Sequence, residues 1–407
     1  MVIFNPADPR WVSEPGPLFD EIREGAPIHR TPDNYWVLSR HADCLEVLRE
    51  KSASSDSFNL APDKQPRGFT SSSDEMAREL IRATGEDTRP FLFRDPPDHT
   101  RLRALVQRAF TPRRVGELSG FVTNVARSSL RDHLDGEPFD AVQQLAWSIP
   151  VAVICEMLAI PASDHDSFQR HSAQLARGLD PDFLLSDADR VERDEALMHF
   201  INYFSALFAE RRASPGDDLL SALVAAHDGT DQLSEAELLS TAILLLVAGH
   251  ETTMNLISGS LLLLSRDHAA QAYLRANGVD RLAVDELLRL VSPVQLTGRT
   301  LTSDLVVGGE KLERGSFAMI LLAAANRDPS AFANPTTLSL HRDPNPQLGF
   351  GFGLHHCLGA PLARLEAQVV LSELFAVTSS YEVVGDVAYR PNFVLRGLER
   401  LEVVLHA

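Results

Sequence analysis

Residues 350–364, FGFGLHHCLGAPLAR, bring together the residue types of a thiolate site. Gly351 and Gly353 allow tight loop geometry, and Gly359 lets a flat group approach the backbone. The residues after Cys357 predict the start of a helix with a proline in its first turn. Unpaired N–H groups and the positive dipole end of a helix lower the pKa of a thiol placed there. The stretch therefore predicts a metal-ligating thiolate at Cys357.

Other kinds of site fit this stretch poorly. A dinucleotide loop of the form G-x-G-x-x-G is broken by His356, and no second cysteine completes a C-x-x-C pair. A Cys–His protease dyad normally brings its partners together from separate chain segments, so two neighbours are not expected to form one. The remaining alternative is a lone cysteine in inert packing, which the three glycines and the helix start argue against.

A second polar group interrupts the most apolar segment of the chain. Residues 234–267 predict one helix on the order of 50 Å long, opened by a capping box between Ser234 and Glu237. The helix is apolar on all sides, so we expect it to be buried. Its middle carries AGHETT, residues 248–253, whose polar groups cost free energy when buried without partners.

Three interpretations of AGHETT follow. In the first, Thr252 bonds back to a carbonyl and Gly249 relieves crowding at a kink. A zinc site would need H-E-x-x-H, but the second histidine is missing after His250 and Glu251. In the third, the helix widens beside a cofactor, Gly249 leaves room for a ligand, and Glu251 and Thr252 relay protons. These residues alone leave the first and third interpretations open.

Composition narrows the class of protein. The 407 residues carry a formal net charge of −18, which argues against nucleic acid as a partner. Three scattered cysteines do not make a disulfide framework, so a reducing, cytoplasmic location is expected. The start of the chain does not resemble a secretory signal, and no run of eighteen apolar residues predicts a membrane span.

The elements expected to position these groups are mostly helical, with small β-sheets. Helical spacing of apolar residues occurs at 100–110, 117–134, 141–159, 191–212, 216–227, 234–266, 269–276 and 279–291. Strands are predicted within 28–39 and at 304–307, 317–320, 381–384 and 401–405. Residues 52–90 and 165–190 are expected to be loops that move to admit a ligand. One domain is predicted over 1–407, with 1–25 as an N-terminal extension and 26–407 as the core.

Motifs at matching distances carry a family resemblance. The pattern F-G-x-G-x-H-x-C-x-G, then x-x-L-A-R-x-E, resembles the haem loop of the cytochrome P-450 haem-thiolate monooxygenases. It is filled by Phe350, Gly351, Gly353, His355, Cys357, Gly359, Leu362, Ala363, Arg364 and Glu366. Residues 286–289 match the family's E-x-x-R, and residues 248–253 match its oxygen-binding groove. Residues 95–100 and 326–329 also resemble stretches of bacterial members, so the likeness spans about residue 26 to the end.

The resemblance implies a single-domain cytochrome P-450 fold with haem b between the long helix and the Cys357 loop. Cys357 is then the axial metal ligand, with His355 reaching a haem propionate and His356 facing solvent or playing a structural part. Arginine suits propionates because its planar fork binds two oxygens. The residues expected at the cofactor are His99, Arg103, Ala248, Gly249, Arg299, Phe350, His355, Cys357 and Gly359.

The same resemblance implies roles for two further groups. Thr252 is expected to hold a hydrogen-bond network that delivers protons during oxygen activation, and Glu251 to connect that network to solvent. Glu286 and Arg289, joined by Arg342, are expected to form a buried ion cluster with a structural role.

The positions of the arginines predict an electron-donor partner, and the apolar candidate pocket walls predict the class of substrate. Arg101, Arg108, Arg113 and Arg114 would form a basic patch that docks an acidic ferredoxin-type electron donor, with an ordinary solvated face as the alternative. A hydrophobic small molecule is expected as substrate, because the candidate pocket walls are apolar. These are Phe93, Leu244, Val247, Val294, Leu296, Phe393 and Val394. A peroxide-using peroxygenase and a non-catalytic haem sensor are the alternatives to an O₂-dependent monooxygenase.

Overall fold

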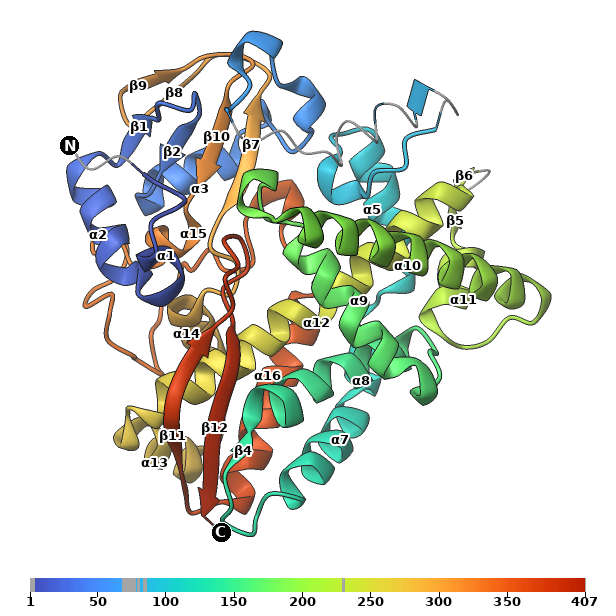
Figure 1. Cartoon of the computed structure of the whole chain (residues 1–407), viewed down its shortest axis with the longest axis vertical. Coiled ribbons are helices and arrows are strands. Elements are labelled where there is room, and N and C mark those ends of the chain that lie inside the picture. Colours follow the sequence, from blue (N-terminus) through green and yellow to red (C-terminus); the bar gives the residue numbers. More distant parts are fainter. Residues whose placement is uncertain (1–3, 68–77, 79–80, 83–85, 229–230, 407) are drawn as a thin grey trace.

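The computed structural model describes residues 4–67, 78, 81–82, 86–228 and 231–406. Helices form most of the molecule and small sheets lie at one side and along one edge, so the predicted fold class is confirmed (Figure 1). Part of the predicted 52–90 loop lies outside the described residues. Within these ranges, none of the helices combines the length and apolarity that crossing a bilayer requires.

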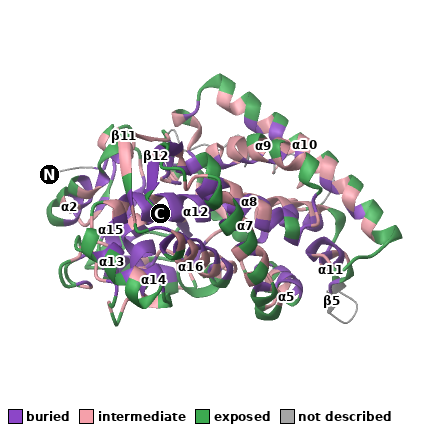
Figure 2. Ribbon diagram, turned by 90° about the horizontal axis from the view of Figure 1, so that it is seen from below, coloured by how far each residue is buried: buried purple, intermediate pink, exposed green. Residues whose placement is uncertain are grey.

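The helical part is built around one long central helix, α12 (Glu235–Ser265). Its predicted capping box is present, because the Ser234 N–H donates to Glu237 Oε2 at 2.9 Å and the Glu237 N–H donates to Ser234 Oγ at 3.3 Å. Figure 2 shows α12 mostly buried at the centre. The other helices of this part are α5 (Asp98–Ala109), α6 (Pro112–Glu117), α7 (Ser119–Arg131), α8 (Ser148–Met157), α9 (His165–Arg177), α10 (Asp187–Ala213), α11 (Leu219–Ala225), α13 (His268–Asn277), α14 (Arg281–Val291) and α16 (Ala360–Val377).

Two of the sequence-based expectations for this helical part need correction. The segment expected to be a loop at 165–190 contains the helix α9 and the start of α10, which is capped by Ser186 and Asp189. The predicted helix at 141–159 begins as a π-helix, Val142–Trp147, before α8. Such wide turns are rare and often occur at functional sites.

The larger sheet joins segments from both halves of the chain. Its order is β1-β2-β10-β7-β3, and only the β2–β10 pair is parallel. The strands are β1 (Ile28–Arg30), β2 (Trp36–Leu38), β3 (Ala53–Ser54), β7 (Thr297–Leu301) and β10 (Phe317–Ile320). A second sheet has the order β11-β12-β4, with β11 (Ser380–Tyr389), β12 (Leu398–His406) and β4 (Phe139–Asp140). The hairpins β5 (His227–Asp228)–β6 (Asp231–Gln232) and β8 (Leu305–Val307)–β9 (Glu310–Leu312) complete the strands.

The first 25 residues, expected to be an extension, contribute to a hydrophobic core. They form the helices α1 (Arg10–Ser13) and α2 (Pro15–Gly25), and they precede α3 (His41–Arg49). Trp11 is 1% exposed, and its ring centroid lies 4.9 Å from that of Phe393. The Trp11 indole N–H donates to the Phe393 carbonyl at 2.8 Å. A short helix, α15 (Leu322–Ala325), packs against both α2 and α3.

Candidate active site

The Cys357 loop is held in a tight conformation just before α16. Its backbone N–H donates to the Phe350 carbonyl at 2.9 Å. Gly351 and Gly353 have φ angles of 66° and 72°, in the left-handed region that favours glycine. A Cβ on Gly353 would lie 2.6 Å from the Leu48 carbonyl oxygen, so this loop also needs glycine for its close approach to α3.

Cys357 is exposed at its surface, but protein atoms surround its thiol closely enough for loss of solvent to be the main influence on its pKa. Burial raises the pKa of the thiol above its ordinary value. The backbone N–H groups of Gly359 and Ala360 and the charge of Arg103 oppose that rise. This corrects the expectation of a lowered pKa, since loss of solvent outweighs the helix start. A metal ion at the sulfur would supply the missing stabilisation of the thiolate.

Several basic groups near this loop form no ion pair with any of the described residues. His99 is 1% exposed, and neither of its ring nitrogens has a hydrogen-bond partner. Arg299, on β7, is 7% exposed and donates to Thr297 Oγ1 at 3.2 Å and the Gly298 carbonyl at 2.7 Å. Arg103 Nη2 donates to the His356 carbonyl at 2.6 Å. Within the described ranges, no carboxylate forms an ion pair with either arginine.

Electrostatics in this cluster point to an anion. Burial lowers the pKa of Arg299 to about 10, opposed weakly by Asp95. Burial, followed by Arg299, His99 and Arg103, lowers the pKa of His355 to about 3. Buried basic groups normally have a counter-charge or hydrogen-bond partner. The set therefore fits a dianionic group, and with a cysteine thiol beside it the residues fit a haem and its propionates.

Ala248 and Gly249, in the middle of α12, differ in their surroundings. Ala248 is exposed although the residues around it are mostly buried, so α12 borders open space there. A Cβ on Gly249 would instead lie 3.3 Å from Ile154 Cδ1 on α8. This corrects the reason expected for Gly249, because the lack of a side chain serves close packing between α12 and α8 rather than room for a ligand.

The hydroxyl of Thr252 makes the back-bond of the first interpretation of AGHETT. It donates to the Ala248 carbonyl at 2.9 Å, and Thr253 makes the same kind of bond to the Gly249 carbonyl at 3.3 Å. A hydroxyl has one donor and two acceptor lone pairs. The Thr252 oxygen can therefore still accept hydrogen bonds, and the back-bond does not exclude the relay.

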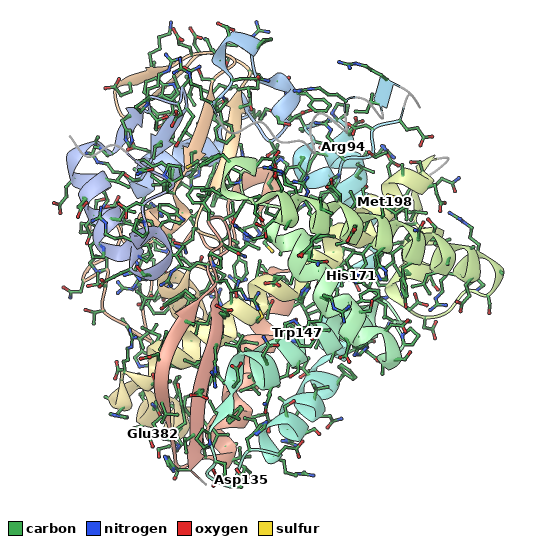
Figure 3. The ribbon with its side chains drawn as sticks, viewed as in Figure 1. Arg94, Asp135, Trp147, His171, Met198 and Glu382 are labelled. Atoms are coloured by element: carbon green, nitrogen blue, oxygen red, sulfur yellow. The ribbon has the colours of Figure 1, made fainter. Side chains whose placement is uncertain are left out.

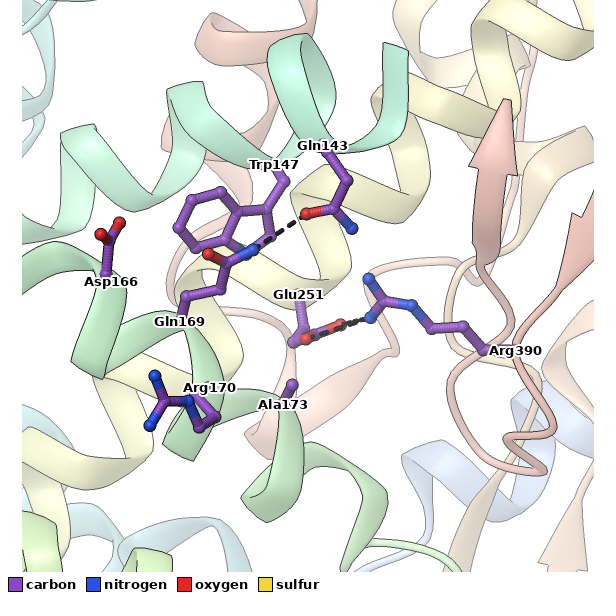
Figure 4. Close-up of a pocket in the computed structure, with 8 residues that line it drawn as sticks. All are labelled: Gln143, Trp147, Asp166, Gln169, Arg170, Ala173, Glu251 and Arg390. Carbon is purple, nitrogen blue, oxygen red and sulfur yellow. Dashed lines mark hydrogen bonds and ion pairs between the residues drawn. The ribbon is translucent and has the colours of Figure 1, made fainter. Parts of the chain in front are cut away.

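Glu251 lines a pocket of 610 Å³ that several polar side chains border. The side chain of Glu251 is 1% exposed, and its Oε2 lies 2.9 Å from Arg390 Nη1 (Figure 4). The pocket is lined by Gln143, Trp147, Asp166, Gln169, Arg170, Ala173, Glu251 and Arg390. Cys357 is not among these residues, so the pocket is separate from the thiol site.

The preceding residue, His250, is fully buried and joined to α9. Its Nδ1 donates to the Leu246 carbonyl at 2.7 Å, and its Nε2 lies 3.0 Å from Ser172 Oγ. Burial lowers the pKa of His250. The neutral ring, with its proton on Nδ1, therefore accepts a hydrogen bond from the Ser172 hydroxyl at Nε2, which ties α12 to α9.

Glu286, Arg289 and Arg342 meet in one buried cluster. Arg289 donates two hydrogen bonds of 2.8 Å to the Glu286 carboxylate, and both side chains are 0% exposed. Arg342 Nε lies 3.0 Å from Glu286 Oε2. The Ser339 N–H and the Asn345 amide also donate to Glu286, and Arg289 donates to the carbonyls of Asn326 and Pro335. The cluster thus fixes the chain between α15 and the Cys357 loop to α14.

The expected pocket walls divide into two groups. Phe393 and Leu296 are 2% and 8% exposed and pack in the core cluster that contains Trp11, and their contact with a ligand stays a prediction. Leu244, Val247, Val294 and Val394 are half-buried, and Phe93 is 40% exposed. These five remain candidates for contact with a ligand.

The expected basic patch is partly occupied by internal contacts. Arg101 forms an ion pair with Glu237 of α12, and Arg114 donates to the Asp218 carbonyl at 3.4 Å. Arg113 has a side chain that is 88% exposed and pairs with Glu117 at 2.9 Å. Arg108 is exposed. Arg101 therefore supports α12, and only Arg108 and Arg113 present an exposed basic surface.

Sequence reasoning missed Arg390 and Ser172. Both bond to AGHETT residues from segments far away in the chain, and Figure 3 shows how many side chains fill this region around Trp147 and His171. The sequence did indicate that Glu251 and His250, once buried, would require hydrogen-bond or ion-pair partners. It did not indicate which residues those partners would be.

Comparisons with known proteins place this arrangement in a family. The family model described as Cytochrome P450 matches residues 72–377. The chain is 35% identical over 417 residues to the polyketide biosynthesis cytochrome P450 PksS of Bacillus subtilis, covering 99% of each chain. It is 36% identical to the vitamin D(3) 25-hydroxylase of Pseudonocardia autotrophica, covering 96% of this chain and 94% of that protein. The solved structure of Mycobacterium smegmatis CYP164A2 matches with a TM-score of 0.87 and 40% identity, covering 98% of both chains.

The chain belongs to the cytochrome P450 family. It is a monooxygenase, an oxidoreductase of the same kind as its hydroxylase relatives. Members of this family carry a haem with a cysteine thiolate ligand and use redox partners.

Proposed function

We propose that this chain inserts one oxygen atom of O₂ into a hydrophobic small molecule, with haem b held by Cys357 as axial ligand. The observation that carries the proposal is the thiol at the start of α16 beside two buried basic groups, His99 and Arg299, that form no ion pair among the described residues. Arg103 and His355 belong to the same group. When bound, the haem supplies the activation of dioxygen and the transfer of one oxygen atom to the substrate.

The residues of the chain orient and protect that chemistry. Phe350 packs beside Arg364, whose guanidinium carbon lies 4.4 Å from the ring centroid, and shields the cysteine loop. Thr252 accepts and donates hydrogen bonds at the exposed middle of α12, and Glu251 moves protons to it from solvent. An acid beside an alcohol favours use of O₂ over the alternatives, because neither a peroxygenase nor a haem sensor needs a proton relay.

Electron supply is proposed to come from a ferredoxin-type donor that docks by charge. Arg108 and Arg113 are the exposed arginines of the patch. Replacing both with glutamine should slow reduction by ferredoxin at low salt and reduce the salt dependence of the rate. An Arg101 variant is a poor test, because it would also leave Glu237 of α12 with only its longer ion pair, to Arg94 at 3.9 Å.

The spectrum of the reduced protein with carbon monoxide tests the central claim. The wild type should show the strongly red-shifted absorption of a thiolate ligand, and Cys357→His should shift it to an imidazole-type position. Cys357→Ser provides a second variant if the histidine does not load haem. A wild-type spectrum of the imidazole type would overturn the proposal and favour the sensor alternative.

A further inference from the structure

The connection between β11 and β12 contains two residues whose backbone groups are all bonded to distant parts of the chain. The N–H groups of Phe393 and Val394 donate to Asp180 Oδ2 at 2.9 Å and to Asp180 Oδ1 at 2.8 Å, respectively. Their carbonyl groups accept hydrogen bonds from the Trp11 indole at 2.8 Å and from the Gln295 N–H at 2.9 Å. In Figure 1 the β11–β12 hairpin reaches toward the segment between α9 and α10, to which Asp180 belongs.

Asp180 supplies a carboxylate where a β-sheet would supply backbone carbonyls. It is 4% exposed, and each of its oxygens accepts one of the two neighbouring N–H groups. Arg177, three residues earlier on α9, forms an ion pair with Oδ2. Burial raises the pKa of Asp180, and the two N–H groups and the charge of Arg177 oppose that rise. Hydrogen bonds to a charged acceptor are stronger than those between neutral groups, so the carboxylate ties the two segments firmly together.

The segment 178–186, which carries this carboxylate, is itself fixed to the helices on either side. Arg177 donates to the Leu184 carbonyl at 2.8 Å, and Arg190 of α10 donates to the Asp182 carbonyl at 3.0 Å. Leu184 also packs against the core cluster to which the N-terminal helices contribute. The carboxylate therefore has a defined position and can fix the backbone that it binds.

Val394, one of the two residues held in this way, lies where a ligand is expected. Its side chain and that of Val294 are half-buried. A β-bridge between Val294 and Leu395 keeps the two segments together. Because a side chain moves with its backbone, a shift at the two N–H groups would move this wall. Apolar pockets separate ligands by fit at the level of single methylene groups, so the position of the wall matters for selectivity.

We propose that Asp180 is a positioning residue for ligand selectivity. By holding both N–H groups it fixes the backbone at Val394, and with it the side chain that Val394 presents beside Val294. Asp180 acts through Val394 and does not itself contact the ligand. This inference rests on the proposed function, because it takes Val394 and Val294 as contacts of the ligand. It adds that the segment between α9 and α10 sets the shape of the ligand pocket at this wall.

The tie itself is tested by hydrogen exchange of the haem-loaded protein without ligand, resolved to single amides by electron-transfer fragmentation. Asp180→Ala removes both acceptors, so the amides of Phe393 and Val394 should exchange at least tenfold faster than in the wild type. Asp180→Asn keeps the size of the side chain and one oxygen acceptor, so one of the two amides should still exchange faster. This second variant decides the outcome if Asp180→Ala does not load haem. Unchanged exchange at both amides would contradict the tie.

Selectivity is tested with two probes that bind haem iron through the same ring, 1-methylimidazole and 1-octylimidazole, followed by the shift in absorption. The short probe reports on the iron site, and the long one also extends to the apolar walls. Asp180→Asn should raise the dissociation constant of 1-octylimidazole at least fivefold and change that of 1-methylimidazole less than twofold. A ratio of the two constants equal to that of the wild type would overturn the proposal.

Asp182→Asn is the matched control. Asp182 lies in the same segment, but its carboxylate pairs with Arg193 of α10 at 3.2 Å. If both variants changed the ratio of dissociation constants equally, the effect would be a general loosening of the segment, and the specific role of Asp180 would be wrong. A wild type without the thiolate spectrum would instead overturn the proposed function. The exchange of the Phe393 and Val394 amides could still be measured in that protein as purified.

Discussion

The imidazole rings of His99 and His355 lie with their centroids 4.2 Å apart, at an interplanar angle of 45°. One ring comes from α5 and the other from the loop before Cys357. Burial is the main reason that the pKa of each ring is lowered, and the next cause is the charge of an arginine, Arg103 for His99 and Arg299 for His355. Two basic rings beside buried arginines are unfavourable as a purely protein arrangement. They become favourable once an anion lies among them.

Removing one charge from this cluster should weaken haem retention. Arg299→Met keeps the length of the side chain and removes its guanidinium. Hydrogen bonds to charged groups contribute about 1.5–3 kcal/mol, so haem should dissociate roughly 10- to 100-fold faster. Transfer of haem to an apoprotein acceptor measures the rate. Arg314→Met, at an exposed position after β9, should leave it unchanged.

Breaking the ion cluster should prevent a stable holoprotein. Glu286→Ala leaves Arg289, which is 0% exposed, without its carboxylate, at a cost of about 3–5 kcal/mol. Haem content and the urea midpoint should both fall. Glu286→Gln keeps some hydrogen bonds and should lose less. A Glu286→Ala protein with full haem content would contradict the structural role.

Thr252→Ala should divert oxygen to peroxide while ligand-induced spectral shifts persist. The variant removes the hydroxyl that lies at the exposed part of α12. Peroxide formed per oxygen consumed measures the effect. Thr253→Ala is the matched control, because Thr253 makes the same back-bond but is 2% exposed. Equal peroxide yields from the two variants would count against the relay.

Stability should fall as the solution becomes acidic below about pH 6.5. Burial, followed by the charge of His171, lowers the pKa of His199, and the two rings stack 3.9 Å apart. Asp164 opposes this shift, and Ser167 and Tyr203 also face the ring. Between the lowered pKa and about 6.5 the unfolded chain binds more protons, so the free energy of unfolding rises with pH there.

The measurement is the urea midpoint of the holoprotein at several pH values. His199→Gln, which removes the titrating ring and keeps a polar side chain, should reduce the slope below pH 6.5. Above that pH the ring of His199 is neutral in both the folded and the unfolded protein. The free energy of unfolding should then no longer change with pH because of this residue. A slope that is the same in both proteins would show that other groups dominate.

Local sequence patterns predicted the helices that have periodic apolar spacing or a capping box at their start. The apolar spacing around α12 and the Ser234–Glu237 box are local signals, and both are present. The motif around Cys357 likewise predicted the start of α16. Segment 165–190 was misassigned, because α9 is amphipathic but carries histidines, glutamines and arginines that resemble a polar loop.

Long-range contacts could not be predicted in the same way. The electrostatic state of Cys357 depends on burial by the whole fold, which outweighs the helix start that the motif contains. Phe393 was predicted as a pocket wall because it is apolar and lies near the end of the sequence. Its contacts with Phe4 and Trp11, near the other end of the chain, could not be predicted from that local pattern.

The bond between Trp11 and Phe393 joins residues 382 positions apart. At about 5–20 residues per second, a ribosome needs on the order of 20 to 80 s to make the chain between them. During that time Trp11 has only local neighbours such as Phe4 and Phe19, and the strand β2 has β1 but lacks its parallel partner β10. The N-terminal segment is therefore among the last parts to reach its native contacts, and the nascent chain exposes an apolar surface that chaperones can bind until synthesis ends.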